Sequence, residues 1–190
     1  MQNRIWIVLC VVLSVSLGAQ EDAGPGTEPG AGSDSGPELP RQFRGISLGM
    51  GLEELKTALA ADALFSFRGD RDVSFLPDPQ QNLVETTGLS FVKRAFFQLN
   101  GGALFIMAFT MNTDLVDYYS LFTALTEKYG PPDSLNPRQS VWENGSTRLA
   151  LERPLTVKYI DLGVFNEIVG DSTVQETHEL RLRQEFIDAF

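Results

Sequence analysis

The feature that most restricts the fold of this 190-residue chain is a pair of apolar segments joined by Asn100-Gly101-Gly102. The segments 91–99 and 103–111 are rich in Phe, Val and Ile, which favour β-strands. Asn-Gly is a preferred dipeptide for a tight hairpin turn, because both residues tolerate positive φ. Both segments are apolar at consecutive positions for much of their length. The sequence therefore predicts a long antiparallel hairpin in the middle of a sheet, covered by helices.

Helical periodicity occurs at three places in the chain. The first stripe follows Gly51, an acceptable N-cap, and the second follows Asp114, its expected N-cap, and ends at Gly130. A capping box, Thr173-x-x-Glu176, predicts a C-terminal helix over 173–190. The three apolar stripes consist of Leu52, Leu55 and Leu59; of Leu115, Tyr118, Phe122, Leu125 and Tyr129; and of His178, Leu182, Phe186 and Phe190.

The remaining strands are expected to be short. A second hairpin turns at Asn144-Gly145, and two further strands flank a turn at Gly69-Asp70. Helix followed by hairpin thus occurs twice, although no residue-level repeat is visible. These patterns predict an α+β fold: an antiparallel sheet of two β-hairpins plus additional strands, packed against two or three helices on one face. The arms of the second hairpin are 139–143 and 147–152, and the additional strands are 65–67, 73–76, 83–87 and 157–162.

The N-terminus has the pattern of a secretory signal peptide, expected over residues 1–19. Arg4 precedes an apolar run over 5–17, which fits an h-region of about 7–15 residues but not a span of about 17–25. Ser16 and Gly18 suit cleavage near Gly18 or Ala19. We therefore expect an exported protein, periplasmic or secreted, with no transmembrane span in the mature chain. An uncleaved N-terminal tether stays open as an alternative.

Cys10 is the only cysteine, and it lies inside the apolar run rather than after it. This position argues against lipidation, and removal of the signal leaves a mature chain without a thiol. Thiol catalysis, thiolate zinc sites and disulfides are then excluded. Removing Arg4 from the 15 basic residues leaves 14 against 25 acidic residues, a net charge of −11. A surface of this sign disfavours nucleic acid as a ligand.

Residues 20–42 have a different composition from the rest of the chain. They are rich in Gly, Pro and acidic residues, so they cannot bury enough apolar surface to offset the chain entropy of ordering. We expect a disordered linker there and a single α+β domain over 43–190.

The structural motifs resemble those of a loose class of small bacterial exported α+β proteins, some of them similar to SmpA-like assembly-factor modules. The resemblance covers about residues 43–162. It lies in the segment that opens the first helix (45–55), the F-x-L-N-G-G-x-L-F hairpin (97–105), L-x-x-K-Y-G-P-P (125–132) and the W-E-N-G-S-T-R-L hairpin (142–149). It implies a periplasmic or outer-membrane-associated compartment, and it transfers no catalytic residue. Lipid-anchored members of the class carry a suitably placed cysteine, which this chain lacks.

Candidate catalytic residues are few. His178 is the only histidine, which excludes histidine-based triads and multi-histidine metal sites. Paired carboxylates such as Glu143 and Glu152 on the second hairpin would suit a hydrolase of an envelope polymer, although solvated strand charges are the simpler interpretation. No cofactor or metal site is expected.

One segment begins like a calcium-binding loop, Asp70-x-Asp72-x-Ser74. Phe75 stands at the position that needs glycine, and Gln81 at the position of the bidentate glutamate. The match therefore fails.

Three further motifs have both a functional and a structural interpretation. Arg68-Gly69-Asp70 is an adhesion-type tripeptide that also suits a turn. Asn144-Gly145-Ser146 is formally a glycosylation acceptor and also a favoured hairpin turn. Trp142, Tyr118 and Tyr119 could line a recognition groove or fill the core. In each case the structural interpretation is preferred.

The function that the sequence favours is an exported, non-enzymatic envelope protein that binds another envelope protein or assists assembly. The alternatives are a carboxylate-based hydrolase and a surface adhesin that uses the Arg68-Gly69-Asp70 turn. Ligand, partner and oligomeric state are left open.

Overall fold

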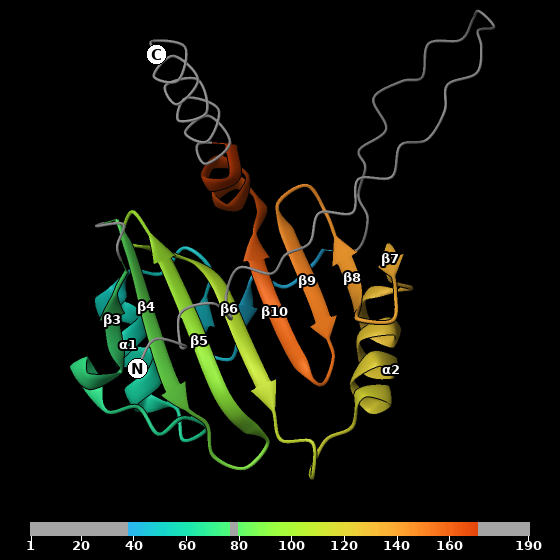
Figure 1. The fold of residues 1–190 in the computed structure, drawn as a ribbon, viewed down its shortest axis with the longest axis horizontal. Helices are drawn as coiled ribbons and strands as arrows, with labels where there is room; N and C mark the ends of the chain where they lie inside the picture. The colour runs from blue at the N-terminus through green and yellow to red at the C-terminus, as the bar shows by residue number, and fades with distance from the viewer. Residues whose placement is uncertain (1–37, 77–79, 171–190) are drawn as a thin grey trace, which may run out of the picture. The chain divides into compact units, whose positions relative to one another are not determined.

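The computed structural model of the chain describes residues 38–76 and 80–170 (Figure 1). The expected signal peptide with Cys10, and the expected helix over 173–190 with His178, lie outside these residues. In chain order the elements are β1 (Gln42–Phe43), β2 (Ile46–Ser47), α1 (Leu52–Ala61), the 3₁₀ helix η1 (Gly69–Asp72), β3 (Val73–Phe75), β4 (Gln81–Thr87), β5 (Val92–Asn100), β6 (Ala103–Met111), α2 (Tyr118–Tyr129), β7 (Ser134–Leu135), β8 (Gln139–Glu143), β9 (Thr147–Glu152) and β10 (Thr156–Asp161). Residues 162–170 are also helical.

Strands β3 to β10 form one antiparallel sheet, which confirms the expected α+β class. The strand order is β3-β4-β5-β6-β10-β9-β8-β7, and Figure 1 shows the strands side by side in this order from left to right. Each half of the sheet is a helix followed by four antiparallel strands: α1 with β3–β6, and α2 with β7–β10. The last strands of the two halves, β6 and β10, pair with each other. The two halves are therefore topologically equivalent about the β6–β10 junction.

The predicted long hairpin lies inside this sheet. Strands β5 and β6 pair over their whole lengths, and Gly101 and Gly102 both adopt positive φ in the turn between them. Their neighbours on the two sides are β4 and β10, so neither strand is an edge. The Asn100-Gly101-Gly102 signal was therefore interpreted correctly, because only residues that tolerate positive φ close such a turn without strain.

The hydrophobic core lies on one face of the sheet, and both long helices pack there. Leu55 and Leu59 of α1 are fully buried in it, and Phe122 of α2 packs on Trp142, with 6.2 Å between the ring centroids. Four aromatic rings from separate segments meet beneath α1, which concentrates apolar surface and stabilises this half. The four are Phe65, Phe97, Phe109 and Phe43.

The ordered chain begins before the expected domain boundary at residue 43. Leu39 is buried in the core, and β1 starts at Gln42. The predicted boundary at residue 43 is therefore a few residues too late. The single large apolar side chain of this segment, Leu39, is enough to hold it against the core.

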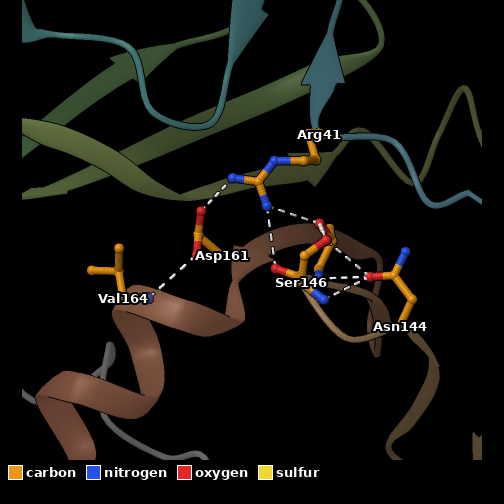
Figure 2. Close-up of polar contacts among 6 residues, drawn as sticks. Arg41, Asn144, Ser146, Asp161 and Val164 are labelled. Atoms are coloured by element: carbon orange, nitrogen blue, oxygen red, sulfur yellow. Dashed lines mark hydrogen bonds and ion pairs between the residues drawn. The ribbon is translucent and has the colours of Figure 1, made fainter.

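Arg41, just before β1, links the start of the domain to its far end (Figure 2). Its guanidinium forms an ion pair with Asp161 and donates hydrogen bonds to the carbonyl oxygen of Ser146 (3.2 Å) and to Oγ1 of Thr147 (3.1 Å). Asp161 in turn accepts a hydrogen bond from the backbone N–H of Val164 (3.3 Å), at the start of the helix over 162–170. Partial burial disfavours the Asp161 carboxylate, but the bonds from Arg41 and Val164 outweigh this cost and lower its pKa.

Two expectations about local structure are wrong, and one helix was not expected. Helix α2 is capped by Asp117, whose carboxylate accepts from Ser120 N–H (2.9 Å), whereas Asp114 lies in a preceding turn held by Asn112. Segment 65–67 is not a strand and contributes one isolated bridge at Phe65. The helix over 162–170 was not expected, because Gly163 stands in its first turn.

Candidate functional site

The sheet has a second face, which we call the open face. Within the described residues, α1 and α2 both pack on the core face, so neither helix covers the open face. The open face consists of every second residue of the six inner strands: Gln81, Leu83, Glu85 and Thr87 of β4; Arg94, Phe96, Gln98 and Asn100 of β5; Ile106, Ala108 and Thr110 of β6; Thr156, Lys158 and Ile160 of β10; Arg148, Ala150 and Glu152 of β9; and Gln139, Val141 and Glu143 of β8.

An apolar row crosses the middle of the open face. Reading across the strands, Phe96 is paired with Ala108, Ala108 with Lys158, Lys158 with Ala150, and Ala150 with Val141. The face of an antiparallel sheet opposite its core normally carries polar residues, so an apolar row there is informative. Within the row Ala108, Ala150 and Val141 are buried and Phe96 is half-buried. The small alanines on both sides of the lysine leave low relief at the centre of the face. Such a surface suits contact with another flat surface.

The charged side chains of the open face neutralise one another. Lys158 pairs with Glu152 at 2.8 Å, and Arg94 pairs with Glu85 at 3.1 Å. A third pair joins Arg148 to Glu143 at 2.6 Å. The formal charge of the six residues is zero, on a chain whose net charge is −10. The open face is therefore a neutral region of an acidic protein.

The first turns of the helix over 162–170 reach the edge of this face. The Phe165 ring lies over the guanidinium of Arg148, at 5.9 Å from the ring centroid. Figure 1 shows this helix rising from the end of β10, in the middle of the sheet. It borders the open face at one end, and the apolar residues of the row are buried apart from Phe96, which is half-buried.

Comparison with known families gives one match. The model of the TP0088 domain matches residues 41–171, more than two thirds of the chain. The chain belongs to the TP0088 domain family. No curated protein and no solved structure matches it. The matched region of the TP0088 domain begins at Arg41 and includes both halves of the sheet.

The two acidic residues considered for hydrolysis do not face each other in the TP0088 domain. Glu143 is opposite Arg148, and Glu152 is opposite Gln139, four residues away along β8. At about 3.3 Å per residue this places the two backbones about 13 Å apart along the strand direction. Each carboxylate is also bonded to a basic side chain. The geometry contradicts a facing pair and agrees with the interpretation as strand charges.

The adhesion-type tripeptide lies at η1. Asp70 is 88% exposed, but its carboxylate forms an ion pair with Lys56 of α1 at 2.9 Å. Arg68 donates from Nε (2.9 Å) and Nη2 (2.6 Å) to the buried Asp72. The tripeptide therefore serves as a bonded turn before β3. Asp72, the second acid of the failed calcium motif, is occupied by the same arginine.

The three aromatic candidates have different positions. Trp142 is fully buried, and its Nε1 donates to the carbonyl oxygen of Gly130 at 2.8 Å, so it belongs to the core. Tyr118 is half-buried on the core side, where its hydroxyl is bonded to Ser140 Oγ at 2.9 Å. Tyr119, however, is 75% exposed. The core interpretation therefore holds for Trp142, and not for Tyr119.

The formal glycosylation motif forms the turn between β8 and β9. Asn144 Oδ1 accepts hydrogen bonds from the N–H groups of Ser146 (3.0 Å) and Thr147 (2.8 Å). This side chain closes the hairpin, as the preferred interpretation expected.

The described part of the chain holds neither a metal-binding cluster nor a helix that could span a membrane. Within 38–76 and 80–170, no three His, Cys, Asp or Glu side chains gather in a way that could hold a metal ion. Over the same residues, no helix has the length and apolar character required to cross a bilayer.

The open face was missed at the level of the sequence, although it left a signal. Strand β10 alternates Thr156, Lys158 and Ile160 with apolar residues, and strand β9 places Arg148 in an otherwise apolar run. Single basic residues at alternate strand positions mark a half-exposed face. Which strands pair, and hence that Ala108 and Ala150 flank Lys158, follows only from the topology.

Proposed function

We propose that this TP0088-domain protein is an exported, non-enzymatic module that binds another envelope protein through the open face. The observation that carries the proposal is the apolar row across a neutral sheet face on which neither α1 nor α2 packs. Protein interfaces combine an apolar centre with a polar rim and a low density of unpaired charge, and the open face has these properties.

The charge distribution supports this proposal. An acidic chain repels acidic partners at long range, and a neutral region allows close approach without that cost. The three ion pairs on the open face already satisfy their charges, so a partner need not supply counter-charges when it excludes water. The half-exposed Phe96 ring of the apolar row then supplies favourable burial.

Export rests on the pattern of the first 19 residues. A basic start, an apolar run over 5–17 and small residues near Gly18 are typical of a cleaved signal. The acidic and Gly/Pro-rich segment that follows would separate the domain from its point of attachment or release. An envelope protein is therefore the partner that we expect.

Site-specific photocrosslinking in the native cell tests the proposal. A photoreactive residue at Gln98, on the open face beside the apolar row, should give a discrete crosslinked band whose partner mass spectrometry identifies. The same residue at Glu127, exposed on α2, is the control and should give no such band. Equal crosslinking at the two positions, or none at Gln98 under saturating illumination, would contradict binding through this face.

A pair of matched substitutions tests the apolar row itself. Phe96→Ser removes the aromatic ring of the row, and Phe75→Ser makes the same change at an 82% exposed phenylalanine on edge strand β3. We expect Phe96→Ser to reduce the Gln98 crosslink at least tenfold and Phe75→Ser to leave it within twofold. Circular dichroism confirms that both variants are folded.

A further inference from the structure

A second surface lies beside the N-terminus of α2, on the other side of the sheet from the open face. It is a hollow of about 520 Å³ between α2, β7 and the end of β9. We call it the arginine hollow and define it by six of its residues: Tyr118, Tyr119, Phe122, Leu135, Asn136 and Arg153. Its volume falls in the range of natural ligand sites, about 300–1,000 Å³.

Arg153 is held in a fixed position inside this hollow. Its guanidinium lies over the Tyr118 ring, with 4.1 Å between Cζ and the ring centroid. The Tyr118 hydroxyl is itself bonded to Ser140 Oγ (2.9 Å) and to the carbonyl oxygen of Leu151 (3.4 Å). A cation stacked on an immobilised ring loses little side-chain entropy when it binds a ligand. The guanidinium edge is thus oriented before a ligand arrives.

Arg153 has a second arginine next to it and no acidic partner. The N–H of Arg153 donates to the carbonyl oxygen of Arg138 at 2.8 Å, so the two residues are neighbours across β8 and β9. In the described residues neither guanidinium forms an ion pair, whereas Arg41, Arg44, Arg68, Arg94 and Arg148 each do. Two adjacent like charges without a counter-charge are unfavourable. Because Arg138 and Arg153 have no counter-charge of their own among the described residues, an anionic ligand would relieve their repulsion.

One carboxylate, that of Asp117, lines the hollow. Its two oxygens accept from Ser120 N–H (2.9 Å) and Ser120 Oγ (2.6 Å) as the cap of α2. Asn136 Oδ1 accepts from the N–H groups of Arg138 and Gln139, which leaves its amide nitrogen as a donor. Apart from this capping carboxylate, the polar side-chain groups available in the hollow, on Arg153 and Asn136, are donors.

The remaining walls are apolar and exposed. Tyr119 is 75% and Leu135 is 66% exposed, and Phe122 forms the wall towards α2. Large exposed apolar side chains around a shallow hollow mark sites of protein recognition. A ligand that fits must therefore present an anion and a large apolar group side by side.

We propose that the arginine hollow binds an acidic peptide segment of a partner protein, with a carboxylate next to an aromatic or large aliphatic side chain. The carboxylate pairs with Arg153, the amide nitrogen of Asn136 donates to it, and Arg138 attracts further acids of the segment. The apolar side chain packs between Tyr119, Phe122 and Leu135. Guanidinium and carboxylate match in geometry and form charge-assisted hydrogen bonds.

The probe is the N-acetylated and C-amidated peptide Gly-Ser-Glu-Phe-Asp-Leu-Gly-Ser, titrated into the mature protein and followed by NMR chemical shifts. Blocked ends exclude binding of a free α-carboxylate. We expect saturable shifts at residues of the hollow and a Kd in the micromolar to millimolar range. The matched peptide with Gln and Asn in place of Glu and Asp should bind at least tenfold more weakly. No saturable shift with the acidic peptide, or equal affinity for the neutral one, overturns the proposal.

Two matched variants locate the interaction. Arg153→Gln should weaken the acidic peptide at least tenfold and leave the neutral peptide unchanged. Arg71→Gln removes the same charge from η1, where the arginine is exposed and forms no ion pair within the described residues, and should change the affinity less than twofold. An equal loss in both variants would mean attraction by net charge alone and would overturn the site. Because Phe96→Ser alters only the open face, this proposal and the proposed function fail independently.

Discussion

The two halves of the sheet share one topology and differ in how well their helices are buried. In the first half, Leu55 and Leu59 of α1 are fully buried over a cluster of phenylalanine rings. In the second half, Tyr129 is the buried residue of α2, and Tyr118, Phe122 and Leu125 are half-buried. The arginine hollow and the exposed Tyr119 and Leu135 lie beside α2.

This difference assigns separate roles to equivalent elements. We expect α1 to contribute more stability than α2, because fully buried side chains contribute the largest transfer free energies. The second half keeps apolar surface available at the cost of weaker packing. A recognition site is expected on the less buried half, since apolar side chains that are already packed cannot contact a partner.

Equal truncations in the two helices test this division and should produce the largest effect. Leu59→Ala removes a fully buried side chain of α1, and Leu121→Ala a half-buried one of α2. We expect losses in the free energy of unfolding of about 3 and about 1 kcal/mol, respectively. Urea denaturation, followed by Trp142 fluorescence, measures both. Equal losses would show that the halves are equally stabilising.

The equivalent turns of the two halves give a second, smaller contrast. Gly88 follows β4 and Gly145 lies between β8 and β9. A Cβ on Gly88 would lie 2.2 Å from the carbonyl oxygen of Val92, whereas no atom lies within 4 Å of one on Gly145. Gly88→Ala should destabilise the domain by about 2 kcal/mol and Gly145→Ala by less than about 0.5 kcal/mol. Thermal unfolding of both variants measures the two losses of stability. A larger loss from Gly145→Ala than from Gly88→Ala would contradict the prediction.

The contact of Arg41 with Asp161 should give the smallest effect, and one that depends on pH. Because the pKa of Asp161 is lowered in the folded protein, its contribution is present above the unfolded pKa, about 4, and is lost as pH falls through the folded value. The guanidinium is partly exposed, so Arg41→Ala should cost only about 0.5 kcal/mol at pH 7 and less at pH 3.

Denaturation at the two pH values measures this difference, with Arg71→Ala as the control that should show none. A loss from Arg41→Ala that is independent of pH would mean that the hydrogen bonds to Ser146 and Thr147, rather than the ion pair, carry the contribution.

Much of the local structure could be predicted, because it depends on neighbouring residues. Strand β6 and the hairpin β8–β9 occur at the expected positions, since Asn-Gly turns and β-branched or aromatic runs act over short range. Gly51 caps α1, with its N–H bonded to Glu54 Oε2 at 3.0 Å. The cap of α2 was wrong because two aspartates, Asp114 and Asp117, compete for one helix start, and the contacts of Asn112 decide between them.

The two Asn-Gly turns also show the limit of reading a repeat from sequence. One joins β5 to β6 and the other joins β8 to β9, so they stand at non-equivalent points of the two halves. Helix followed by hairpin was visible twice, but the equivalence of the halves lies in the strand order. Strand order depends on pairing between distant segments, which local patterns do not encode.

By itself, the sequence determined the class of the fold, the central hairpin and the acidic character of the chain, because these depend on residue type and short-range spacing. The tertiary structure alone decided that β6 pairs with β10, and this single junction places Lys158 between two alanines on the open face. It also brought Arg153 over Tyr118 and beside Arg138, residues 35 and 15 positions apart in the chain. Both candidate surfaces arise from side chains that meet only after distant strands pair.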